Sequence, residues 1–191
     1  MIDLFSPVER NAAFHPDNAA IHFEGETLTY QRLAARVRAV AEDLAAHGVA
    51  RGDRVVVLAE NHPDTLVLLH ACARLGAIMA PLNWRLALDE LAYAVTHADP
   101  KVIAYGPGYG ETAQTLGRGR TLLAMGPALT EREDGEGIAA GALEDDGLLV
   151  YTSGTTGRPK GALISQRALM WNAIQSHHMH QMTAADHVLT V

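Results

Sequence analysis

The chain has 191 residues, of which 48% are hydrophobic and 19% are charged. This composition is typical of one globular domain, or of one domain with a small appendage, and it excludes a disordered chain. The formal net charge of −7 argues against a protein that tracks the phosphates of a nucleic acid. The single cysteine, Cys72, excludes an internal disulfide and a metal site built from several cysteines, and we expect it to be a small buried hydrophobe.

Neither an export signal nor a membrane span is apparent in the sequence. The first five residues lack the basic segment and apolar core of a signal peptide. The most apolar stretch, residues 66–82, is interrupted by His70, Arg74 and Pro81, whereas a bilayer span needs about 20 largely uncharged apolar residues. We therefore expect a cytoplasmic protein.

The first 105 residues alternate between segments typical of strands and segments typical of helices. Short β-branched runs predict strands, and apolar residues spaced by three and four predict helices that end at glycine. The predicted strands are 19–23, 27–30, 54–59, 78–81 and 101–105, and the predicted helices are one capped by Thr29 that runs to about His47, 64–75 and 89–97. We expect strands 19–23 and 27–30 to form a hairpin. The alternation as a whole predicts an α/β fold with a mixed, mostly parallel sheet and flanking helices.

Glycines and acidic residues accumulate in the loop-rich segment 105–147. Only residues 120–125 have the pattern of a strand, and we expect much of the remainder to be exposed loop without a sharp domain boundary. Regular structure is predicted to resume in the region 148–161, which consists of a strand and a glycine-rich loop. A strand at 162–164 and a helix capped by Ser165 that runs to about His180 are predicted to follow.

The final residues, 186–191, have the pattern of an apolar strand that stops part-way. An unpaired hydrophobic strand leaves a sheet edge and an apolar face without cover. We therefore expect this chain to be the front part of a longer protein.

The segment most suggestive of chemistry is 149–161, with the sequence LVYTSGTTGRPKG. A strand leads there into a loop that is rich in hydroxyl side chains and glycines and contains Arg158 and Lys160. Glycines allow backbone N–H groups to face a ligand, and consecutive amides can form a concavity that holds an anion. Hydroxyl groups and cations are further donors to phosphate oxygens. In a chain of net charge −7, this local set of donors predicts a polyphosphate site.

Other chemical motifs fit less well. A Walker loop requires G-x-x-x-x-G-K-[ST], but Pro159 stands at the second glycine and Gly161 stands at the hydroxyl residue. A serine nucleophile at Ser153 would need G-x-S-x-G, which the sequence does not supply. Three histidines near the end of the last helix lack a cysteine or a strong carboxylate partner nearby and are expected to be a solvated helix end rather than a zinc site: His177, His178 and His180.

The segment 149–160 resembles the signature phosphate-binding loop of the adenylate-forming enzymes, which include acyl-CoA synthetases, peptide-synthetase adenylation domains and luciferases. Segments 28–33 and 74–83 are similar to earlier motifs of that family. The helix start at 165–169 is similar too, although Gln166 stands where the family usually has His. Pro81-Leu82-Asn83 together with Arg85 resembles the acyl-CoA synthetase branch. The resemblance implies that residues 1–191 are the N-terminal part of the large AMP-binding domain, and that the C-terminal lid domain is absent.

The resemblance also implies a two-step reaction. A carboxylate attacks the α-phosphate of ATP, which gives an acyl-adenylate and pyrophosphate, and a thiol, usually that of CoA, then displaces AMP. By the same resemblance the β- and γ-phosphates of ATP are held by Thr152, Ser153, Gly154, Thr155, Thr156, Gly157 and Lys160. Thr152 is the implied ligand of Mg²⁺. The family's adenylation lysine and acyl pocket lie further along the sequence, so we expect no catalytic residue in this chain and no complete reaction by it alone.

Two alternatives stay open at this stage: a non-catalytic nucleotide- or partner-binding module, and an adenylation domain that loads a carrier protein. The expected partners are a small carboxylic acid, ATP and CoA, with neither nucleic acid nor a membrane span. We also expect exposed apolar surface where the rest of the domain would dock, and hence self-association, including a homo-oligomer.

Overall fold

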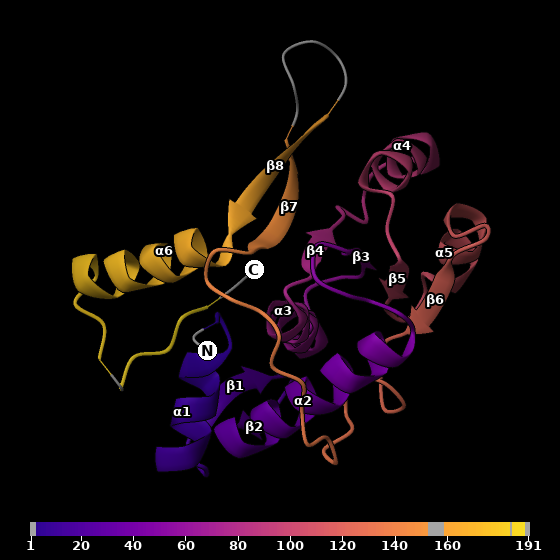
Figure 1. The fold of residues 1–191 in the computed structure, drawn as a ribbon. Helices are drawn as coiled ribbons and strands as arrows, with labels where there is room; N and C mark the ends of the chain where they lie inside the picture. Colours follow the sequence, from indigo (N-terminus) through magenta and orange to yellow (C-terminus); the bar gives the residue numbers. More distant parts are fainter. Residues whose placement is uncertain (1–2, 153–158, 184, 190–191) are drawn as a thin grey trace.

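A computed structural model describes residues 3–152, 159–183 and 185–189 (Figure 1). Within these ranges one sheet carries the fold, and neighbouring strands follow the order β6-β5-β3-β4-β7-β8. The strands are β3 (Arg54–Leu58), β4 (Ile78–Pro81), β5 (Val102–Tyr105), β6 (Thr121–Ala124), β7 (Asp146–Thr152) and β8 (Lys160–Ser165). All neighbours pair in parallel except β7 and β8, which are antiparallel. The prediction of a mixed, mostly parallel sheet is confirmed.

Helices cover both faces of this sheet (Figure 1). Val55 and Val57 of β3 pack with α2 (Tyr30–Ala46) and α3 (Pro63–Leu75) on one face. Val56 and Leu58 pack on the other face with α4 (Leu88–Ala98) and α5 (Gly110–Leu116). Because both faces are buried, the central strands are almost entirely apolar, as is usual for parallel strands.

The remaining elements lie around these layers. Strands β1 (Ala19–Phe23) and β2 (Glu26–Thr29) form the predicted antiparallel hairpin. Helix α1 (Ser6–Phe14) packs on α2, and α6 (Gln166–Met179) follows β8. No helix among the described residues is long and apolar enough to cross a membrane.

Three predicted helix ends are confirmed by their local geometry. The Thr29 hydroxyl accepts a hydrogen bond from the Arg32 amide at 3.4 Å and caps α2. The Ser165 hydroxyl accepts one from the Ala168 amide at 3.2 Å and caps α6. Gly76 ends α3 with a φ of 70°, in the left-handed region where a glycine avoids the steric cost of a side chain.

The loop-rich segment 105–147 differs in part from the expectation. It contains α5, which the sequence did not predict because its seven residues are too few to display a periodic apolar pattern. Residues 126–145 form no helix or strand, yet Leu129 and Thr130 are buried and the Arg132 guanidinium lies 2.6 Å from the Asp43 carboxylate of α2. Part of this segment therefore packs on α2, whereas many of its other residues are exposed, as expected.

Helix α1 and the C-terminal residues also differ from the sequence-based description. The sequence analysis assigned no helix to residues 6–14. The prediction of a strand at 186–191 is wrong for its described residues, 186–189, which form no strand and leave Val188 and Leu189 70% and 85% exposed. An apolar pattern favours a strand only where a neighbouring strand satisfies the backbone hydrogen bonds.

A buried polar network joins the N-terminal segment to α3 and α6. The Gln166 side chain is fully buried; its Oε1 accepts a hydrogen bond from the Leu4 amide at 2.8 Å, and its Nε2 donates to the Ala73 carbonyl at 3.0 Å. Nearby, the buried Asp3 carboxylate pairs with the Arg74 guanidinium at 3.0 Å. These contacts fix the start of α6, and with it the base of the β7–β8 hairpin.

Cys72, a residue of α3, is completely buried in the core, as predicted. Burial raises the pKa of its thiol to about 12, and a smaller effect of a backbone hydrogen bond opposes this shift. The side chain therefore stays a neutral thiol and acts as a packing group.

Candidate functional site

The β7–β8 hairpin lies at one edge of the sheet and projects beyond it (Figure 1). Thr152 is the last residue of β7, and Lys160 is the first residue of β8. Since β7 runs parallel to β4, Thr152 lies at the carboxyl end of the parallel strands, where open α/β sheets bind their ligands. Five residues predicted to contact phosphate lie outside the described residues: Ser153, Gly154, Thr155, Thr156 and Gly157.

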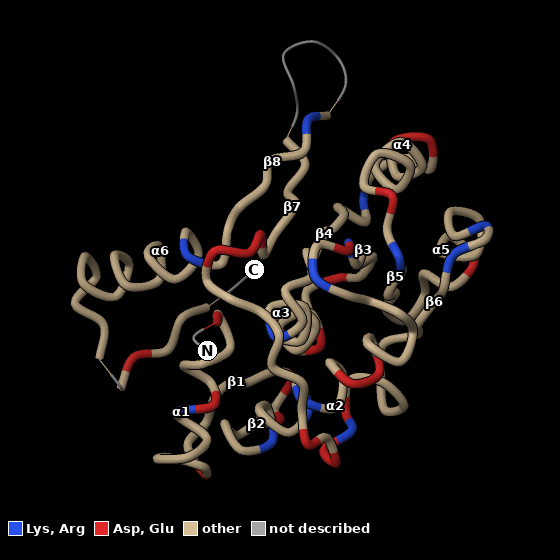
Figure 2. Tube along the Cα trace, in the orientation of Figure 1, with Lys and Arg blue, Asp and Glu red and all other residues tan. Residues whose placement is uncertain are grey.

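The structure brings Thr152 and Lys160 together. They are direct partners in the antiparallel register of β7 and β8, so their side chains leave the same face of the hairpin. Both residues are exposed. The only charged residues of the two strands, Asp146 and Lys160, stand at opposite ends of the hairpin (Figure 2). The Thr152 hydroxyl and the Lys160 ammonium group are thus exposed to solvent, and neither strand places a carboxylate beside them.

The opposite face of the hairpin packs on α4. Leu149 is buried there, and the Tyr151 hydroxyl donates a hydrogen bond to the Ala94 carbonyl at 3.0 Å. The Nδ1 atom of His97 lies 2.9 Å from the same hydroxyl oxygen. The pKa of Tyr151 is raised, mainly by burial and further by Tyr93, whereas the charge of Arg54 opposes the shift. The sequence analysis did not find these contacts, because they join residues that are 54 and 57 positions apart in the sequence.

The sequence of the chain matches a known protein family. A family model described as "AMP-binding enzyme" matches residues 8–191, which is nearly the whole chain. The chain belongs to the AMP-binding enzyme family.

Relatives of this AMP-binding chain include proteins named as CoA ligases. It is 40% identical over 165 residues to the feruloyl-CoA synthase of an Amycolatopsis species, a match that covers 86% of this chain and 34% of that protein. It is 37% identical to the indoleacetate–CoA ligase of Aromatoleum aromaticum, with 99% of this chain and 40% of that protein covered. The chain thus spans between a third and two fifths of the length of these curated relatives.

A solved structure agrees with the fold. The ATP-bound MatB of Rhodopseudomonas palustris is 31% identical and superimposes with a TM-score of 0.81, covering 94% of this chain and 38% of that one. The α/β architecture described above is therefore that of the AMP-binding family.

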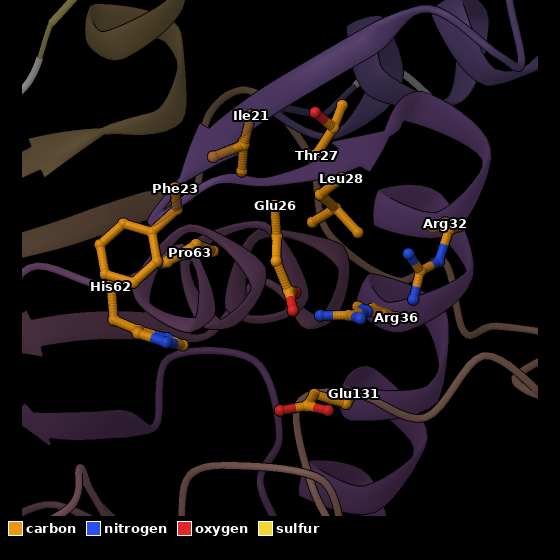
Figure 3. A pocket seen from close by; sticks show the side chains of 10 residues that line it. All are labelled: Ile21, Phe23, Glu26, Thr27, Leu28, Arg32, Arg36, His62, Pro63 and Glu131. Carbon is orange, nitrogen blue, oxygen red and sulfur yellow. The ribbon is translucent and has the colours of Figure 1, made fainter.

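A separate hollow of about 110 Å³ lies between the β1–β2 hairpin and the side of α2 (Figure 3). The Nε atoms of Arg32 and Arg36 share one Glu133 oxygen, at 2.8 Å and 3.4 Å. The hollow is lined by Ile21, Phe23, Glu26, Thr27, Leu28, Arg32, Arg36, His62, Pro63 and Glu131. The carboxylates of Glu26, Glu131 and Glu133 thus lie around the guanidinium groups of Arg32 and Arg36. Because the positive charges are already compensated, this hollow does not favour a polyphosphate. Thr152 and Lys160, by contrast, have no carboxylate from their own strands beside them.

The described residues contain no group of three or more His, Cys, Asp or Glu side chains placed to hold a metal ion. The hydroxyl of Thr152 makes no hydrogen bond to another described residue, so its oxygen is available to a ligand. Hydroxyl oxygen is a donor that Mg²⁺ accepts, usually beside water and substrate phosphates. The chemistry of the Thr152 side chain is therefore compatible with one protein ligand of a Mg²⁺ ion whose other ligands are water and phosphate.

Proposed function

We propose that this chain supplies the phosphate-binding part of an enzyme that activates a carboxylic acid with ATP and transfers the acyl group to CoA. The proposal rests on one observation in an AMP-binding chain, the pairing of Thr152 with Lys160 on the exposed face of the β7–β8 hairpin. The names of the relatives support CoA as the acceptor, since the feruloyl and indoleacetate enzymes are both CoA ligases.

In this proposal each side chain has a simple electrostatic task. The Lys160 ammonium binds oxygens of the β- and γ-phosphates and stabilises the negative charge that accumulates on pyrophosphate as it leaves. The Thr152 hydroxyl would hold Mg²⁺, which neutralises phosphate charge when it is bound. We assign the phosphate contacts of residues 153–157 from the resemblance of their sequence alone. Because the chain spans between a third and two fifths of these relatives, we propose that the 191 residues alone bind phosphates without completing a turnover.

Lys160→Ala tests the assignment of the phosphate site. Inorganic tripolyphosphate is a suitable probe, because it presents the phosphate chain without requiring an adenine site. The loss of a charge-assisted contact is expected to raise its Kd by roughly 10- to 100-fold, as measured by isothermal titration calorimetry with Mg²⁺ present.

Lys101→Ala is the matched control, because Lys101 is an exposed lysine at the opposite end of the sheet strands. We expect this control to bind tripolyphosphate like the parent chain. Equal binding by the Lys160→Ala variant and the parent would contradict the assigned site.

Release of pyrophosphate tests the reaction itself. The protein that carries this chain is expected to release pyrophosphate from ATP when given its acid, in a panel that includes ferulate, indole-3-acetate and fatty acids. The 191 residues alone are expected to release none. CoA and a phosphopantetheine carrier protein, offered in parallel, distinguish a CoA ligase from a carrier-loading enzyme.

A further inference from the structure

The end of the β7–β8 hairpin lies beyond the support of the sheet. The parallel pairing of β7 with β4 is formed at Leu148 and Met79, near the start of β7. From there the hairpin projects away from the other strands, with α4 beside it (Figure 1). The position of Thr152 and Lys160 at the far end therefore depends on contacts other than the ladder with β4.

Helix α4 contacts β7 through the hydroxyl of Tyr151, which has two hydrogen-bond partners on the helix. Tyr151 donates its single hydroxyl hydrogen to the Ala94 carbonyl, at 3.0 Å. The lone pairs of that oxygen remain as acceptors, so His97 donates from Nδ1–H across 2.9 Å. The two rings also meet edge to face, with centroids 5.7 Å apart.

Helix α4 also contacts the start of β8, through the residue that precedes it, Pro159. The Tyr93 hydroxyl lies 3.4 Å from the Pro159 carbonyl, which accepts its hydrogen bond. The Tyr93 ring stacks on His97 with centroids 6.0 Å apart. Gly161 of β8 lies beside this contact: a Cβ there would be in ordinary contact with His97 Cε1, at 3.5 Å, but would crowd Leu149 Cδ1, at 2.7 Å. Tyr93 and His97 therefore touch both strands within one residue of Thr152 and Lys160.

We infer that Tyr93 and His97 are positioning residues for the phosphate-binding face of the hairpin, an inference that rests on the proposed function. Side chains alternate along a strand, so Tyr151 faces α4 whereas Thr152 and Lys160 leave the opposite face. The two α4 side chains thus act from behind and touch no phosphate. They hold the two strand ends at the spacing that lets a hydroxyl and an ammonium group bind one ligand together.

The test separates the hydrogen bond from simple packing. His97→Ala removes the Nδ1 donor, whereas His97→Asn keeps an N–H donor at nearly the same distance from the backbone. Tyr93→Phe keeps the stacked ring and removes the bond to Pro159. Thr96→Ala is the matched control on α4, because the Thr96 hydroxyl donates only to the Ala92 carbonyl within its own helix.

Two measurements are made on the 191-residue chain, namely amide hydrogen exchange at Thr152 and Lys160 and the Kd of Mg²⁺-tripolyphosphate. His97→Ala and Tyr93→Phe are each expected to speed exchange at these amides and to raise the Kd by roughly 3- to 10-fold, the effect of one hydrogen bond. His97→Asn is expected to restore both values toward the parent. Thr96→Ala is expected to change neither.

The outcomes distinguish the two proposals. Unchanged exchange in both His97→Ala and Tyr93→Phe would overturn the inference, even if binding fell. Faster exchange with an unchanged Kd would also overturn it, since the contact would then be only structural. A parent chain that binds no tripolyphosphate overturns the proposed phosphate site, and with it any role of α4 in that site, while the exchange data still show whether α4 holds the hairpin.

Discussion

His70 on α3 is a titratable group in an unfavourable place for a charge. Its Nδ1 atom is buried and has no hydrogen-bond partner among the described residues. Burial lowers the pKa of the ring from 6.5 to about 4, and the negative charge of Asp3 opposes this shift only in part. The native chain therefore keeps His70 neutral across the range in which an unfolded chain takes up a proton.

This difference predicts a loss of stability in mild acid. Because the native pKa lies below the unfolded one, the stabilisation is complete above about pH 6.5 and is lost as the pH falls toward 4. From pH 7 to pH 5 the free energy of unfolding should fall by roughly 2 kcal/mol through this group. Urea unfolding of the parent and of His70→Leu at both pH values measures it. An equal pH dependence of the two proteins would contradict the prediction.

Gln166 shows where inference from the sequence stops at the scale of single residues. The sequence analysis identified Gln166 only as a departure from the family at the start of a helix. The structure gives it two buried hydrogen bonds, to Leu4 and Ala73, which lie 162 and 93 positions away. Local patterns carry no information on partners at such distances. For the same reason the sequence did not predict the contacts of His97 and Tyr93, whereas the prediction for Thr152 and Lys160 rests on a motif that is local in the sequence.

At the scale of elements, the length of the apolar pattern decided what could be predicted. Helix α2 repeats its apolar positions over 17 residues and was identified with its cap, whereas the seven residues of α5 were missed. Helix ends marked by glycine were also recognised, and Gly76 is an example. Its left-handed conformation matches the general preference for glycine after the last helical turn.

Gly76 makes a stronger demand than conformation alone. A Cβ at this position would lie 2.6 Å from Asp145 Oδ2, in a carboxylate that is held by Arg51 at 2.7 Å. Gly76→Ala should therefore cost roughly 2–4 kcal/mol, as strain plus a displaced ion pair. Gly108 is a matched control, because its φ is also positive, at 85°, but its Cβ would meet nothing within 4 Å. Gly108→Ala should cost roughly 1 kcal/mol. Equal losses of unfolding free energy in both variants would contradict the role of Asp145.

At the scale of the whole molecule, the alternation of strands and helices was enough to predict the layers. Buried parallel strands need helices on both faces, and each face of β3 found one pair of them. The β7–β8 end of the sheet is different. Gln166 is the only buried residue of α6, and two large apolar side chains of this helix, Trp171 and Ile174, stay about half exposed among the described residues.

That end of the molecule predicts association of the isolated chain. Trp171 and Ile174 of α6 are 54% and 49% exposed and share one helix face, and Leu163 of β8 is 57% exposed. Exposed apolar side chains favour burial against a second molecule. We expect the sedimentation coefficient of the 191-residue chain to rise with protein concentration. The double variant Trp171→Glu, Ile174→Glu should weaken this dependence, because charged side chains resist burial in an apolar contact. Leu88→Glu, at an apolar site on α4 that is 47% exposed, is the control and should leave the association unchanged. A parent chain that sediments as a monomer at every concentration would show that this surface is not adhesive by itself.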